Sequence, residues 1–345
     1  MNRLFSTLTV LLMVLSASAS GQDSSCTLGL QMFHNRRWSE AAAAFRQCEL
    51  QNPGKSDALL YRGKSLVNLQ KYAEAALDLQ TYARSHPQSD DAAYLLAYIA
   101  FRQDKPRESL KLFTDAARIK PPEANDLMIV ALNYVLLKDY SGAAHYLEMS
   151  LKMDPDDIEA RYHLGRVRYQ QNEFDLAIAA FQEVIKRDPA NVKAYDNLGL
   201  SLEAKNQVEA AVAAYRKAIA LDQAVPSHSE QPYLNLGSLL ARSNRLPEAI
   251  PLLTRASEIA PGEFEVHYQL AKAYFDSQRL DSACRQAEQA VKLAPADSSG
   301  HYLLGRIYQR LNRKDLAREQ FRLTAELIHD QEASQKGMAS GLNSR

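Results

Sequence analysis

Histidine, cysteine and carboxylate side chains are the residues of this sequence that could do chemistry, but their spacing matches no catalytic or metal-binding motif. An enzyme site needs a nucleophile beside a base, a carboxylate pair or convergent metal ligands. The chain of 345 residues has eight histidines and three cysteines. It contains no HExxH, no CxxC and no glycine-rich phosphate loop that opens a helix. We therefore expect no catalytic residues, no cofactor and no metal, and we predict that the protein is not an enzyme.

The amino-terminal end resembles a secretory signal peptide. Arg3 precedes an apolar run from Leu4 to Leu15, and Ala17-Ser18-Ala19 supplies a small-x-small cleavage site. The run is shorter than the roughly 20 apolar residues that span a bilayer, so cleavage near Ala19 is favoured over the alternative of a membrane anchor. We predict a signal peptide at residues 1–19 and an exported protein, periplasmic or secreted, with no direct membrane insertion after cleavage.

The charge balance argues against a nucleic-acid partner. The whole chain has 41 basic and 41 acidic residues, and loss of Arg3 with the signal leaves 40 against 41. A nucleic-acid-binding surface would favour a basic stripe that neutralises phosphates. With 46% apolar residues, the chain can instead bury a sizeable core.

The chain repeats itself with a period of 34 residues, apart from four extra residues between 222 and 232. Nine aligned units begin near residues 22, 56, 90, 124, 158, 192, 230, 264 and 298. The eighth place of every unit is Gly or Ala: Gly29, Gly63, Ala97, Ala131, Gly165, Gly199, Gly237, Ala271 and Gly305. The twentieth place is also small throughout: Ala41, Ala75, Ser109, Ala143, Ala177, Ala211, Ala249, Ala283 and Ala317.

Each unit has the pattern of two helices. In residues 158–189, apolar residues recur at helical spacing on both sides of the polar break Gln171-Asn172-Glu173 and stop at Asp188-Pro189. We expect the small eighth-place residue to face the small twentieth-place residue and so to let the two backbones approach closely. The pattern therefore predicts shape and packing, and gives no catalytic chemistry.

These residues closely resemble the tetratricopeptide repeat family. The matching residues of the sixth unit are Tyr195, Leu198, Gly199, Leu202, Ala211, Tyr215 and Ala218. The resemblance implies an all-α, right-handed α-solenoid of about nine helix-turn-helix repeats, here in an exported bacterial protein. Local departures are Arg62 at a usual Leu place, Gln223 and His329 at usual Pro places, and Ala287 at a usually bulky place.

The repeat register predicts the domain organisation. Repeats one to six occupy 22–223, a loop insertion 224–229, repeats seven to nine 230–331 and a polar tail 332–345; whether the insertion is a hinge or a longer loop stays open. The last helix, near Lys314 to Lys336, is expected to cap the stack with Leu316, Phe321 and Leu327 facing inward.

Two of the three cysteines are placed to pair. Cys26 lies in the first helix of unit one and Cys48 in the second, at similar heights of an antiparallel pair. We predict a disulfide, with two buried thiols as the alternative. Cys284 is expected to pack as a small apolar residue.

The resemblance places partner binding on the concave groove formed by the first helices. The candidate groove residues are Tyr94, Tyr98, Phe101, Arg102, Met128, Leu132, Val135, Tyr162, Arg166, Tyr169, Tyr268, Lys272, Tyr302 and Arg306. Aromatic and Arg anchors are typical of peptide-binding hot spots. His267 and His301, 34 residues apart, could approach one another, but their place is normally a packed aromatic in this family.

The sequence thus predicts a noncatalytic scaffold or adaptor that binds a protein or peptide segment in its groove. The alternative is an accessory subunit of an envelope assembly or secretion complex, and an enzyme is disfavoured. The Lys and Asn residues with which family members hold chaperone carboxyl termini are absent as a set. The partner and the oligomeric state stay open.

Overall fold

The computed structural model describes residues 25–54, 57–224 and 228–342, and the predicted signal peptide lies outside them. The described residues form helices and turns, without a strand, which confirms the predicted all-α solenoid of helix pairs. The chain divides into two compact units, Met1–Gln171 and Asn172–Arg345.

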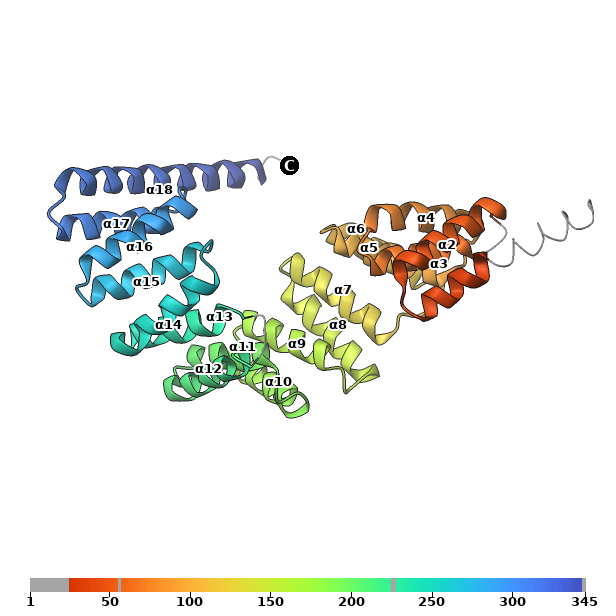
Figure 1. Ribbon diagram of the computed structural model, residues 1–345, viewed down its shortest axis with the longest axis horizontal. Coiled ribbons are helices and arrows are strands. Elements are labelled where there is room, and N and C mark those ends of the chain that lie inside the picture. The colour runs from red at the N-terminus through yellow and green to blue at the C-terminus, as the bar shows by residue number, and fades with distance from the viewer. Residues whose placement is uncertain (1–24, 55–56, 225–227, 343–345) are drawn as a thin grey trace, which may run out of the picture. The chain divides into compact units, whose positions relative to one another are not determined.

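The first unit stacks helix pairs in chain order (Figure 1). Residues 25–34 form the helix that precedes α2. The following helices are α2 (Trp38–Gln51), α3 (Ala58–Asn68), α4 (Tyr72–Ser85), α5 (Asp90–Arg102), α6 (Pro106–Ala116), α7 (Ala124–Leu136), α8 (Tyr140–Met153) and α9 (Ile158–Gln170). Asp157 caps α9 by accepting hydrogen bonds from the backbone N–H groups of Glu159 and Ala160, as acceptor side chains at helix N-caps do.

The second unit repeats the same arrangement. Its helices are α10 (Phe174–Arg187), α11 (Val192–Ala204), α12 (Val208–Asp222), α13 (Gln231–Arg242), α14 (Leu246–Ile259), α15 (Phe264–Asp276), α16 (Leu280–Leu293), α17 (Ser298–Arg310) and α18 (Lys314–Leu342). Pro261 and Pro295 each follow directly on the C-cap of a second helix, because proline cannot continue the helix.

The turn inside each pair is set by one residue in the left-handed conformation. This residue has a φ of 56° to 62° and always occupies the fifteenth place: Arg36, Gln70, Asp104, Lys138, Asn172, Asn206, Asn244, Gln278 and Asn312. In the sixth unit, Gln207 N then donates to Leu202 O at 2.9 Å, the bond of a Schellman motif. Asn tolerates this conformation better than most residues, and four of these nine residues are Asn.

The small eighth-place residue lies closest to a bulky side chain of the second helix. A Cβ on Gly199 would lie 2.5 Å from Tyr215 Cε1, and one on Gly63 would lie 2.7 Å from Leu79 Cγ. The nearest facing residue is therefore the bulky one at the twenty-fourth place, a partner that the sequence analysis did not assign to the eighth place. The eighth place is small because a large side chain of the second helix lies across it.

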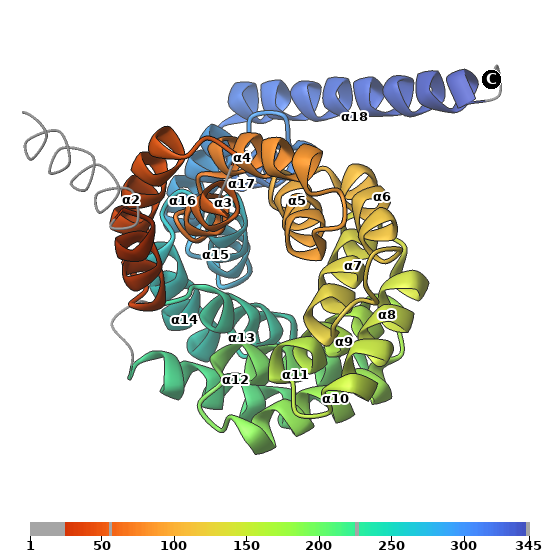
Figure 2. The same ribbon diagram turned by 90° about the vertical axis from the view of Figure 1, so that its right-hand side faces the viewer.

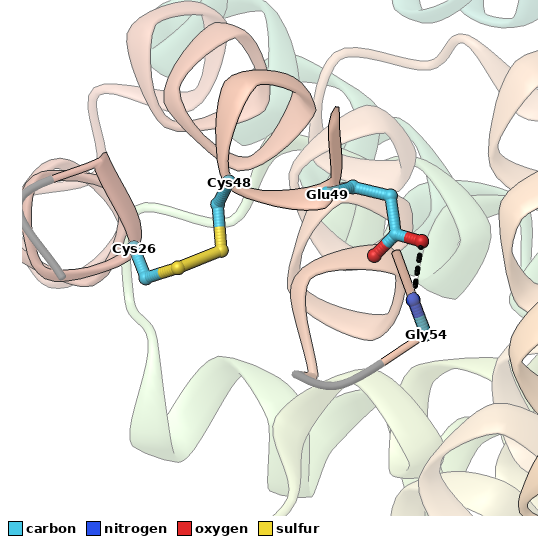
Figure 3. The surroundings of a disulfide bond; sticks show 4 residues. All are labelled: Cys26, Cys48, Glu49 and Gly54. Atoms are coloured by element: carbon cyan, nitrogen blue, oxygen red, sulfur yellow. Dashed lines mark hydrogen bonds between the residues drawn. A yellow bond between two sulfur atoms is a disulfide. The ribbon is translucent and has the colours of Figure 1, made fainter. Parts of the chain in front are cut away.

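A disulfide joins Cys26 to Cys48, with their Cα atoms 5.0 Å apart. Figure 3 shows the bond linking the helix of residues 25–34 to α2. Beside it, Glu49 Oε1 accepts a hydrogen bond of 2.9 Å from the backbone N–H of Gly54 and holds the turn after α2.

The last helix is longer than predicted, and one of its three predicted inward residues is exposed. α18 continues to Leu342, past the expected end at Lys336, and extends beyond its partner α17 (Figure 1). His329 stands where proline is usual, so nothing there stops the helix. Phe321 packs under Gly305 and against Tyr302, but Leu316 is 48% exposed and does not face inward. Its neighbour Ala317 is the buried residue of that turn.

The described part of the insertion is tied to the helix before it. Asp222, at the end of α12, is buried and accepts a hydrogen bond of 2.9 Å from Ser229 N. The apolar core is continuous from Tyr215 on α12 to Leu236 on α13. These contacts tie Ser229 and α13 to the end of α12.

Within each unit the first helices line the inner side of the stack. α3, α5 and α7 contact one another in series, as do α11, α13, α15 and α17, and no comparable contact joins the second helices of the described residues. Figure 2 shows α5 and α7 inside α6 and α8, and α13 inside α14. We call the surface formed by the first helices the inner face of each unit.

Candidate functional site

The inner face of the first unit carries an aromatic and cationic cluster on α5. Arg102 lies between two rings, 5.1 Å from the centre of Tyr72 and 5.7 Å from that of Tyr98, and Nη1 of Arg102 donates to the Tyr98 hydroxyl at 2.6 Å. Tyr94 donates instead to the Lys120 carbonyl at 2.7 Å, and burial raises the pKa of Tyr94. Tyr94 is thus fixed to its own repeat, whereas Tyr98 and Arg102 remain at the surface.

The neighbouring helix α7 adds apolar surface. Leu132 and Val135 are half-buried, and Leu136 is 45% exposed. Met128 is only 6% exposed and packs in the core with Leu147. Met128 therefore supports the fold, and the other three residues are the ones that a partner could contact.

The residues predicted on α9 form a smaller group. The guanidinium of Arg166 lies 6.0 Å from the centre of the Tyr162 ring, and both Tyr162 and Tyr169 are half-buried. Burial lowers the pKa of the adjacent His163 because the charged imidazolium loses solvation. Only Arg166 among the predicted residues of this helix is exposed.

In the second unit, the predicted residues on α15 and α17 meet around Phe275. Arg306 lies 4.9 Å from the centre of the buried Phe275 ring and 5.9 Å from that of Tyr302. Tyr302 is 51% exposed, and Lys272 is exposed. Tyr268 is half-buried and stacks on Phe264, as a packing residue does.

The inner face of the second unit also holds a pocket that the sequence did not identify. It has a volume of about 310 Å³ and is lined from α11, α13 and α15 by Leu200, Glu203, Gln231, Leu234, Asn235, Ser238, Arg242, Glu265 and Gln269. Five of these nine residues, Leu200, Glu203, Leu234, Ser238 and Arg242, occupy repeat places that the predicted groove residues also occupy. The predicted groove residues are mainly aromatic, Arg and aliphatic residues, whereas amides and carboxylates make up most of the lining of this pocket.

Polar bonds organise the pocket walls. Arg242 pairs with Glu203 across α11 and α13, and the buried Tyr215 donates to the other Glu203 oxygen at 3.1 Å. Asn235 donates to both oxygens of Asp196, at 3.0 and 3.1 Å. Asp196 is 7% exposed, and burial raises its pKa to about 6, because an apolar environment disfavours the carboxylate.

His267 and His301 each bond to a glutamine of their own repeat and to the turn that precedes it, and not to one another. Each ring places Nε2 3.0 Å from a turn carbonyl, of Pro261 or Pro295, and Nδ1 2.7 Å from a glutamine of the second helix. Both histidines are buried. Among the described residues, no group of three His, Cys, Asp or Glu side chains could hold a metal ion.

Two buried groups away from the inner faces have structural partners. Arg62, unusual at its repeat place, donates to Asp78 Oδ1 at 3.2 Å, and burial raises the pKa of Asp78 to about 6. Cys284 is buried and donates to Glu288 at 3.2 Å, and burial raises its pKa to about 11. Such a thiol is a packing residue and a poor nucleophile.

Comparison with family models covers most of the chain. A model described as tetratricopeptide repeat matches residues 33–89, 62–124, 131–192, 164–229 and 268–329, and a second with the same description matches 240–285. The chain belongs to the tetratricopeptide repeat family. Members of this family are typically protein-interaction modules, so the inner faces of these repeats are the candidate binding surfaces.

Individual relatives are distant. A BBSome complex member, BBS4 of Xenopus tropicalis, is 24% identical over 158 residues, which are 45% of this chain and 30% of that protein. The chain spans less than a third of that curated relative. The APC/C hetero-tetramer Cut9–Hcn1 has a TM-score of 0.59 at 15% identity, covering 78% of this chain and 52% of the other.

A further solved structure, that of PilW, described as a widely conserved type IV pilus biogenesis factor, has a TM-score of 0.53 at 22% identity. The match covers 59% of this repeat protein and 92% of PilW. At these identities the likenesses show the solenoid fold. Within the described residues, no helix combines the length and apolar character needed to cross a bilayer.

Proposed function

We propose that this tetratricopeptide repeat protein is a noncatalytic scaffold that receives a segment of a partner protein on its inner face. The observation that carries the proposal is the surface of α5 and α7, where Arg102 and Leu136 are exposed and Tyr98 and Leu132 are half-buried beside them. Apolar and aromatic side chains left at the surface in one patch usually mark interaction sites, and a preformed surface lowers the ordering cost of binding.

An exported location supports the same proposal without fixing the partner. The disulfide of Cys26 and Cys48 is stable only where thiols are not kept reduced, which agrees with the predicted signal peptide at 1–19. Membership of an envelope assembly or secretion complex is the second candidate. The fold-level likeness to a pilus biogenesis factor is compatible with it, and recovery of the chain in a membrane complex would distinguish it from a free adaptor.

Two substitutions on the inner face test the proposal. Tyr98→Ala removes the ring that holds Arg102, and Leu132→Arg places a charge in the apolar patch. We expect each variant to lose at least about tenfold in partner affinity, since hot-spot truncations cost about 2 kcal/mol or more. Affinity purification followed by quantitative mass spectrometry would identify the partner and measure the loss.

The matched control is Leu77→Arg. Leu77 is a leucine of similar chemistry on the second helix α4, away from the inner face, and it is 65% exposed. This variant should retain the partner, and circular dichroism should show native helix content for all three proteins. Unchanged capture by both inner-face variants would refute this binding surface.

A further inference from the structure

Three cations lie together on the inner face of the second unit. Lys272 on α15 and Arg306 on α17 occupy the ninth place of successive repeats, and Arg310 follows Arg306 by one helical turn. α15 and α17 contact one another, so the three side chains belong to one surface. We call Lys272, Arg306 and Arg310 the cationic patch.

The patch is not neutralised by the protein. Among the described residues, no carboxylate lies within ion-pair distance of any of the three cations; Arg310 donates at 2.6 Å to an amide oxygen, that of Gln278. By contrast, Arg242 and Arg255 of this unit are paired, with Glu203 and Glu258 respectively. Like charges held together without counter-charges are costly unless a ligand supplies the opposite charge.

Aromatic rings hold the two arginines in place. Arg306 and Arg310 lie 4.9 and 5.9 Å from the centre of the Phe275 ring, and Arg306 also lies over Tyr302. A guanidinium that stacks on a ring keeps its N–H donors free at its edge. Two of these N–H groups can donate to the two oxygens of one carboxylate. Restraint of both side chains lowers the entropy cost of forming those bonds.

We infer that the cationic patch binds an acidic segment of the partner protein, with carboxylates on the arginines and an apolar or aromatic side chain against Tyr302. The inference rests on the proposed scaffold function and adds the chemical class of the partner. The preceding pocket is lined by Glu203, which pairs with Arg242, and by the exposed Glu265. Charge complementarity therefore determines how the bound segment is placed along the inner face, with its acidic residues over the cationic patch of α15 and α17.

The same face disfavours a polyphosphate ligand. A nucleic acid running along the first helices would meet the exposed carboxylate of Glu265 after leaving the cationic patch, and its phosphates would be repelled there. The balanced composition, 41 basic and 41 acidic residues, supplies no extended basic surface to offset that repulsion. A peptide can change its charge along its length, which a phosphate backbone cannot.

Fluorescence anisotropy with defined peptides tests the inference on the full mature chain. The probe is a labelled peptide of alternating Glu and Leu, and the comparison peptide alternates Lys and Leu. We expect the Glu peptide to bind, its affinity to fall as salt rises, and the Lys peptide not to bind. Arg306→Gln with Arg310→Gln should weaken the Glu peptide about tenfold.

The control is Arg255→Gln with Arg285→Gln, which removes two exposed cations from the second helices α14 and α16 and should leave binding unchanged. Equal loss in both double variants would show a net-charge effect and overturn the inference. So would tighter binding of a labelled oligonucleotide, or self-association that the patch variant abolishes. Loss of the partner in Tyr98→Ala without any Glu-peptide binding would leave the scaffold function standing and refute only the acidic partner.

Discussion

At the scale of single residues, the fold depends on how the eighth and twenty-fourth places of each repeat fit together. Tyr215 lies against Gly199, and Leu253 against Gly237, where no Cβ has room. The eighth place also holds Ala beside a bulky residue, since Ala131 shares a core with Leu147. In the eighth repeat, Ala271 shares a core with the small Ala287.

Gly199→Ala should destabilise the protein by about 1–3 kcal/mol, the usual cost of overpacking a core. The new methyl would lie 2.5 Å from the fully buried ring of Tyr215, which has no free space to move into. Urea unfolding followed by circular dichroism measures the change. Gly262→Ala is the control, since nothing lies within 4 Å of its Cβ position, and equal stabilities of the two variants would contradict this packing.

Features that depend on one side chain could be predicted from the sequence. Contacts between two side chains on different helices could not. The small eighth place was visible in the sequence, but its partner was not, because contact between helices depends on how far each is rotated about its axis. The left-handed fifteenth place was missed since Arg36 and Gln70 carry no Asn or Gly signal. The pocket around Asn235 was missed because amides mark a site only after the helices are assembled.

At the scale of helices, the prolines and the 34-residue register predict most helix boundaries correctly. The exposed surface of the last helix, α18, has a different origin. The seventeenth and twenty-first places of the first eight units are apolar and include the pairs Trp38 with Ala42 and Val208 with Val212. Ala42 and Val212 pack in the core with the next repeat's first helix. In α18 these places are Lys314 and Arg318, both exposed, so charge replaces the contact that a tenth repeat would need.

The double substitution Lys314→Leu with Arg318→Ile should therefore replace the charged, solvent-exposed surface of α18 with an apolar surface beside Phe321. We expect the variant to self-associate, with a mass that rises with protein concentration relative to the unmodified protein, because exposed apolar patches promote association. Sedimentation velocity measures the change. Arg285→Ile with Lys292→Leu on α16 removes as many charges elsewhere, and association of that control to the same extent would show that the end of the stack is not special.

At the scale of the whole chain, contacts run mainly between neighbouring helices, so local damage should stay local. The disulfide of Cys26 and Cys48 closes the first repeat, which has a neighbouring repeat on one side only among the described residues. Its loss should cost that repeat about 3 kcal/mol by the loop-entropy model. A repeat in the middle of the stack would be supported from both sides against an equal loss.

Cys26→Ala with Cys48→Ala should accordingly raise amide hydrogen exchange in residues 25–51 and leave α13 to α15 unchanged. Exchange reports local opening free energies segment by segment, so mass spectrometry of peptic fragments resolves the two regions. Cys284→Ala gives the reciprocal control, because that buried thiol packs with Leu304 and Ile307 of α17 and its loss should act on α16 and α17 alone. Faster exchange throughout the chain in either variant would mean that the repeats unfold as one cooperative body, and nearest-neighbour stability would then be the wrong description of this solenoid.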